Sequence, residues 1–137
     1  MHKKRNLIIG LFILVILIFA EAGFYLYNKP RESAAYKTAA VTLSAMALYK
    51  QYEANENAAN KKYLGKVIAV QGSVSTISQQ NGLAVLSLTT GNPAGAINCQ
   101  LFLNDKISAV KVGDAVTIKG KCTGFLMDVN LVDCALP

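Results

Sequence analysis

Few side chains in this sequence of 137 residues have types and spacings that could do chemistry, and its three cysteines stand out. They are Cys99, Cys122 and Cys134, and no C-x-x-C spacing occurs among them. The only histidine, His2, lies in a basic N-terminal flank. We therefore expect no metal site and no histidine acting as a general base.

The number of cysteines is odd, which in an oxidising compartment allows three alternative pairings with one thiol left over. In the strand order derived below, Cys99 and Cys122 lie nearer one rim of a barrel than Cys134 does, and we favour a disulfide between them. A bridge requires α carbons within roughly 7 Å of each other. The alternative is three small buried thiols that fill a core.

The remaining polar residues indicate no reaction. Four acids, Asp105, Asp114, Asp128 and Asp133, fall at turns or strand ends, where solvated or capping roles are expected. The glycine-rich stretch GNPAG has no following GK and opens no helix, so neither a P-loop nor a dinucleotide fingerprint is present. We predict a protein that is not an enzyme, with no catalytic residues and no cofactor.

The N-terminus has the composition of a membrane segment. The flank MHKKRN precedes an apolar run over residues 7–27, about the length that crosses a bilayer, and its basic end is expected to stay in the cytoplasm. A cleaved secretory signal with its cleavage site at Ala20-Glu21-Ala22 is the main alternative, and a buried helix of a soluble protein is a third. We favour an uncleaved single-pass anchor over residues 1–27, a tether over 28–41 and an extracytoplasmic domain over 42–137, at the cell surface or in a periplasm.

A helix is predicted at the start of that domain. Ala45, Leu48, Tyr49 and Tyr52 fall on one helical face, and Thr42 or Ser44 can cap its start. The asparagines that follow predict a break near Ala54. Packing against a sheet is the expected role of the two tyrosines, and ligand binding is the alternative.

Five strand-like segments follow, at residues 66–77, 82–91, 95–103, 114–125 and 128–136, with a short helical or looped connection after the third. Gly72 marks a change from two-sided to one-sided apolar character in the first, which predicts a bend or bulge shared between two sheets. Three strands, a connection and two strands predict a mainly β, five-stranded Greek-key barrel of the oligonucleotide and oligosaccharide binding (OB) type.

The stretches NENAANKKYLGKVIAVQGSVSTI, INCQLFL and VGDAVTIKGKCTGFLMDVNLVDC resemble the tRNA_anti-like group of bacterial OB-fold domains. The resemblance covers roughly residues 42–136. It implies the barrel fold, and it implies no catalytic residues.

Nucleic-acid binding, which the fold suggests, is the alternative function. It needs aromatic platforms on the second and third strands and a basic groove. Those strands offer one outward ring, Phe102. The candidate cations, Lys66, Lys119 and Lys121, are expected to lie together on the neighbouring first and fourth strands, where a solvated face is the alternative to a binding role. The net charge is +6 for the whole chain, and without residues 1–27 it is +4 from eleven basic and seven acidic residues, which is a mild bias. We expect nucleic acid to be a poor ligand.

The favoured function is a membrane-anchored binding or assembly module for an envelope protein, peptide or glycan. Its candidate contact residues are Phe125, Leu126 and Met127, which occur together in the loop between the fourth and fifth strands. OB barrels commonly hold ligands with this loop. Folding of the loop over the barrel end, as a lid, is the alternative, and a structural envelope protein without a discrete ligand is a third class.

Overall fold

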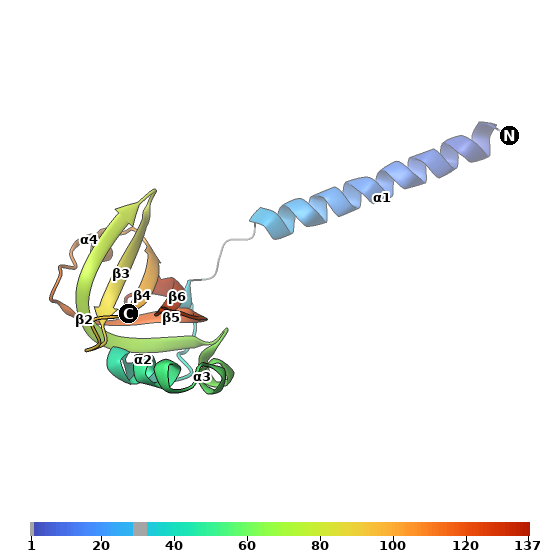
Figure 1. Ribbon diagram of the computed structural model, residues 1–137. Coiled ribbons are helices and arrows are strands. Elements are labelled where there is room, and N and C mark those ends of the chain that lie inside the picture. Colours follow the sequence, from blue (N-terminus) through green and yellow to red (C-terminus); the bar gives the residue numbers. More distant parts are fainter. Residues whose placement is uncertain (1, 29–32) are drawn as a thin grey trace. The chain divides into compact units, whose positions relative to one another are not determined.

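The computed structural model describes residues 2–28 and 33–137 of the chain (Figure 1). These residues form two compact units, divided between residues 31 and 32, which are described separately. Every buried apolar residue of the described chain lies between Ala34 and Cys134. The second unit therefore has its own core, and we expect it to fold without the first.

The first unit is the helix α1, His2–Asn28. Its segment Lys3–Asn28 has a mean hydropathy of 2.8 and is long and apolar enough to cross a membrane, a property that signal sequences share. Large apolar side chains are exposed along it, with Leu7, Phe12 and Phe19 each at least 70% accessible. Apolar side chains all round a helix are a pattern that membrane spans and signal sequences share.

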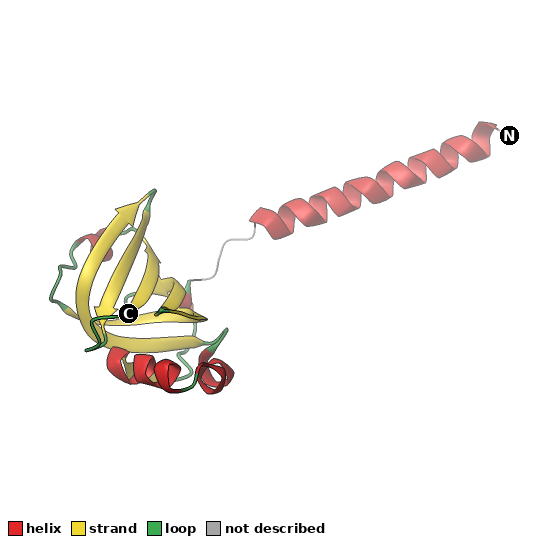
Figure 2. Ribbon diagram, in the orientation of Figure 1, coloured by secondary structure: helices red, strands yellow, loops and turns green. Residues whose placement is uncertain are grey.

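The second unit is a closed barrel of five main strands (Figures 1 and 2). The sheet order is β1-β2-β3-β4-β6-β5, and pairing between β2 and β5 closes it. All pairs among the five main strands are antiparallel except β4 with β6. This is the predicted OB-type Greek-key barrel. The five strands are β2 Val67–Gln80, β3 Leu83–Thr89, β4 Ala96–Phe102, β5 Ala115–Leu126 and β6 Asp128–Ala135.

The first barrel strand, β2, serves two neighbours in turn, as predicted. Its residues 67–73 pair with β5, and its residues 74–80 pair with β3. The register irregularity lies between Val74 and Thr76, not at Gly72. Gly72 instead allows close packing, because a Cβ there would lie 3.1 Å from the Ala45 Cβ and 3.3 Å from the Leu88 Cβ.

Alternation along the strands fills the barrel interior. Every second side chain of β3, β4 and β5 points inward, and Leu86, Ile97 and Ile118 have no accessible surface. The helix α2, Ala45–Ala54, contacts β2, β3, β4 and β6. The short helix α4, Asp105–Ser108, follows the far end of β4 and buries Ile107. Helices thus cover the core at both ends of β4.

The break predicted near Ala54 separates α2 from α3, Glu56–Tyr63. The Ser44 hydroxyl caps α2 by accepting a hydrogen bond from the Ala47 N–H at 3.1 Å. The Asn55 side chain caps α3 in the same way, accepting from the Ala58 N–H at 3.0 Å. The predicted apolar face of α2 is buried, which supports a packing role for its two tyrosines.

Part of the segment predicted as a tether is ordered against the barrel. A 3₁₀ turn, η1 Ala34–Tyr36, buries Ala34. The strand β1, Thr42–Ser44, pairs with β2 in parallel and is a sixth strand that the sequence does not reveal, because three residues carry no usable periodicity. Lys119 Nζ donates to the carbonyl oxygens of Ala35 and Lys37 at 3.0 and 3.1 Å, holding η1 in place.

Candidate functional site

The surface that OB barrels commonly use for ligands is the outer side of the second and third barrel strands, here β3 and β4. Side chains on this outer face alternate with the buried ones, and β3 pairs with β4 over its whole length. We call this surface the β3–β4 face. It comprises Leu83, Val85, Ser87, Thr89, Ala96, Asn98, Gln100 and Phe102.

A ladder of hydrogen bonds organises one half of the β3–β4 face. The Ser87 hydroxyl donates to Asn98 Oδ1 at 2.8 Å, and Asn98 Nδ2 donates to Asp128 Oδ2 at 3.0 Å. The other oxygen of Asp128 accepts from the Ala96 N–H at 2.7 Å. Asp128 therefore caps the start of β4, in line with the capping role expected of the strand-end acids. The face thus offers hydroxyl, amide and carboxylate groups held in fixed positions.

The β3–β4 face lies within a long uncharged segment. From Val67 to Asn104 the sequence contains no Asp, Glu, Lys or Arg, so β2, β3 and β4 carry no ionisable cation. The charged group of the hydrogen-bond ladder is the carboxylate of Asp128, which is negative. Phosphate groups need compensating cations, and this surface supplies none. The absence of charge from Val67 to Asn104 can be read directly from the sequence. The sequence-based prediction considered individual lysines and missed it.

The three candidate contact residues of the loop between β5 and β6 have different environments. Leu126 and Met127 are 84% and 76% exposed, and Met127 takes the left-handed conformation with φ 68°. Phe125 instead turns inward, stacks on the Tyr52 ring with centroids 5.6 Å apart and meets the Tyr49 ring edge-on at 5.8 Å. Phe125 is therefore the lid of the core, and the other two residues form an exposed apolar tip.

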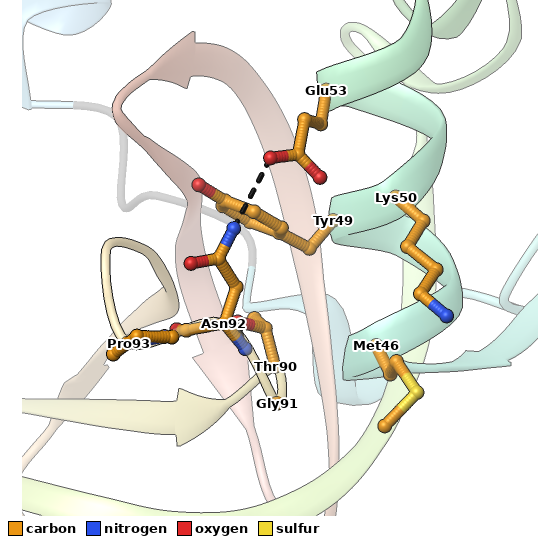
Figure 3. A pocket seen from close by; sticks show the side chains of 8 residues that line it. All are labelled: Met46, Tyr49, Lys50, Glu53, Thr90, Gly91, Asn92 and Pro93. Carbon is orange, nitrogen blue, oxygen red and sulfur yellow. Dashed lines mark hydrogen bonds between the residues drawn. The ribbon is translucent and has the colours of Figure 1, made fainter.

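A hollow of about 330 Å³ separates α2 from the loop between β3 and β4 (Figure 3). Asn92 Nδ2 donates to Glu53 Oε1 across it at 3.1 Å. Its lining is mixed, with an apolar thioether and a lysine on the helix side. The residues around it are Met46, Tyr49, Lys50, Glu53, Thr90, Gly91, Asn92 and Pro93. The contact between Glu53 and Asn92 joins residues 39 positions apart, and no local sequence pattern reports it.

The three predicted lysines do not gather on the β3–β4 face. Lys119 holds η1 through the two carbonyl bonds described above. Lys121 is exposed on β5, opposite Val67, and Lys66 is exposed just before β2. Phe102, 53% exposed, stands apart from them at the end of β4 that pairs with Leu83. The three lysines thus lie on or beside the paired strands β2 and β5, where the Cys122 N–H donates to the Lys66 carbonyl oxygen at 2.9 Å, whereas Phe102 lies elsewhere on β4.

All three cysteines are free, and the predicted disulfide between Cys99 and Cys122 is not formed. The physical reason is the strand order: β6 runs between β4 and β5, and Leu131 pairs with Cys99 on one side and with Cys122 on the other. The Cys122 thiol instead contacts the Tyr52 hydroxyl at 3.2 Å. Burial, together with this hydrogen bond, raises the pKa of Tyr52 above its ordinary value.

Within the described residues, no group of three or more histidine, cysteine or acidic side chains lies in an arrangement that could hold a metal ion.

Comparison with solved structures gives matches to OB-type proteins. A "putative nucleic acid-binding lipoprotein" from Klebsiella pneumoniae matches with a TM-score of 0.57 and 16% identity, covering 70% of this chain and 92% of that one. A putative aspartyl-tRNA synthetase from Leishmania major Friedlin matches with a TM-score of 0.46 and 12% identity, over 82% of this chain and 24% of its own. The first of these supports the fold.

A comparison with curated proteins finds no match. The family model tRNA_anti-like, by contrast, matches residues 1–136, nearly the whole chain. The closed barrel, its strand order and this match agree with one another. The chain belongs to the tRNA_anti-like family of OB-fold domains.

Proposed function

We propose that this protein is a membrane-anchored binding module that holds an envelope protein, peptide or glycan on the β3–β4 face, outside the cytoplasm. The observation that carries the proposal is the uncharged segment from Val67 to Asn104, which covers the strands that OB barrels present to ligands. Its fixed hydroxyl and amide groups suit a neutral, hydrogen-bonding ligand. No group of this surface is arranged to perform a reaction.

The exposed tip extends this surface at one end. Asp128 follows Met127 directly and is bonded to the start of β4, so the tip lies beside the end of the β3–β4 face where β4 begins. Exposed Leu126 and Met127 supply apolar contact next to the polar ladder. An exposed apolar contact beside polar groups in fixed positions is typical of sites that bind peptides or glycans.

The anchor is α1, and its orientation follows from charge. Lys3, Lys4 and Arg5 precede the apolar run, and positively charged flanks stay in the cytoplasm. The barrel, which follows the run, is then exported. Retention of α1 as an uncleaved anchor is favoured by the apolar residues 23–27, which continue beyond the possible cleavage site.

Nucleic-acid binding is the competing function, and the name of the Klebsiella pneumoniae neighbour is the observation that favours it. The two functions differ in the charge that they require. A labelled single-stranded oligonucleotide is titrated with residues 33–137 at low salt, and fluorescence anisotropy is followed. We expect no saturable change.

A matched variant makes that titration informative. Thr89→Lys with Gln100→Lys adds two cations to the β3–β4 face without touching the core, since both positions are outside the barrel. We expect the variant to gain measurable, salt-sensitive binding. Tight binding by the wild-type barrel would reject the proposed ligand class.

A further inference from the structure

We propose that Cys99 and Cys134, and not Cys122, form a disulfide when the chain folds in the presence of a disulfide-bearing oxidant. The pair lies on β4 and β6, the parallel neighbours of the barrel. Both side chains are buried, with accessibilities of 0% and 4%. The inference is independent of the proposed ligand, because it concerns only the interior of the barrel.

A bulge in β6 is what places Cys134 inside. Cys99 pairs with Leu131 and Leu101 pairs with Cys134, so three steps along β6 match two along β4. Asp133 takes up the additional residue with φ 52°. Strict alternation after Leu131 would turn Asp133 into the core and Cys134 out of it. The bulge reverses this and brings the two thiols onto the same inner surface.

The two thiols influence each other. Cys99 is the largest cause of the raised pKa of the Cys134 thiol, as expected of side chains that share the interior of adjacent strands. Gly120 on β5 makes room for it, since a Cβ there would collide with the Cys134 Sγ. Cys99 and Cys134 are diagonal neighbours on adjacent strands, and both side chains lie inside the barrel, which is the arrangement that a disulfide between these two strands requires.

Cys122 has a different environment. It lies on the other side of Leu131, on β5, and its thiol contacts the Tyr52 hydroxyl at 3.2 Å. Pairing it with Cys99 would require two strands separated by β6 to meet. Because its thiol is engaged by the Tyr52 hydroxyl on α2, we infer that Cys122 is the cysteine left unpaired.

The chemistry balances as thiol–disulfide exchange. The two thiols lose two protons and two electrons as the sulfur–sulfur bond forms, and the oxidant's disulfide is reduced to two thiols. Exchange needs a thiolate. The neighbouring Cys99 thiol and burial raise the pKa of Cys134 far above the ordinary thiol range, so the closed barrel supplies little thiolate. The bond therefore forms during folding, before β6 closes the barrel.

The test is oxidative refolding of residues 33–137, the unit with its own core. The reduced, unfolded fragment is refolded in a buffer of reduced and oxidised glutathione, and remaining thiols are alkylated. Cleavage before aspartates then separates the cysteines, because Asp105 follows Cys99 and Asp128 lies between Cys122 and Cys134. We expect one linked pair of peptides, containing Cys99 and Cys134, lighter by two hydrogen atoms, with Cys122 alkylated.

Single substitutions serve as matched controls. Cys122→Ser leaves the linkage unchanged, whereas Cys99→Ser and Cys134→Ser each abolish the intramolecular bridge. Circular dichroism of each refolded product establishes that the barrel has formed. A predominant linkage involving Cys122, or three alkylated thiols in a folded wild-type barrel, would overturn the proposal.

Discussion

Replacing Phe125 by alanine tests whether this residue covers the core, in contrast to the exposed loop residues Leu126 and Met127. Complete removal of a buried phenylalanine side chain costs about 3–5 kcal/mol. Phe125 is half-buried, which reduces that figure, but it also loses two ring contacts worth about 0.5–1.5 kcal/mol each. We expect Phe125→Ala to lower the free energy of unfolding of residues 33–137 by about 2–3 kcal/mol. For a domain of this size the melting temperature falls by about 10 °C.

The control is the double variant Leu126→Ser with Met127→Ser. Both side chains are exposed, so the free energy of unfolding changes by less than about 0.5 kcal/mol. Urea unfolding followed by circular dichroism measures both variants. Equal losses in the two variants would show that the tip belongs to the core, and a negligible loss for Phe125→Ala would refute the assignment of Phe125 as its lid.

Three further perturbations probe the packing that positions the β3–β4 face. Gly95→Ala places a Cβ inside the Tyr49 ring, so urea unfolding is expected to show a loss of about 1–3 kcal/mol. Lys119→Met removes both bonds to η1, and hydrogen exchange of residues 34–41 accelerates, whereas Lys121→Met leaves it unchanged. The raised pKa of Tyr52 means that the folded state keeps a proton that the unfolded state releases above about pH 10. The free energy of unfolding therefore falls there by up to about 1.4 kcal/mol per pH unit, and Tyr52→Phe, measured by urea unfolding between about pH 8 and pH 11, lessens that slope.

The barrel was predictable because its signals are local and repeated. Alternation in five segments fixes which side chains point inward, and the connection after the third segment fixes the Greek-key order. The capping asparagine that breaks α2 from α3 is likewise a local signal. The strand β1 and the ordering of η1 were not predictable, since both depend on contacts with residues far away in the sequence.

The candidate site was predicted only in part, for the same reason. The exposure of Leu126 and Met127 is expected because they lie in a turn. The inward position of Phe125 depends on tyrosine rings of α2, which are distant in the sequence. The bulge at Asp133 turns Cys134 into the barrel interior, and a single residue in the left-handed conformation cannot be recognised from sequence periodicity. The absence of charge from β2 to β4 can be read from the sequence, and it bears more directly on the ligand of the β3–β4 face than the lysines beside β2 and on β5 do.

The central claim, an anchored barrel outside the cytoplasm, is tested most directly by protease access. Spheroplasts containing the full chain are treated with a membrane-impermeant protease, and the products are identified by mass spectrometry. We predict digestion within the barrel's loops while residues 7–27 stay protected, with the intact chain including α1 present before treatment. Protection of the whole barrel, with digestion appearing only after lysis, would contradict the account and place the barrel in the cytoplasm.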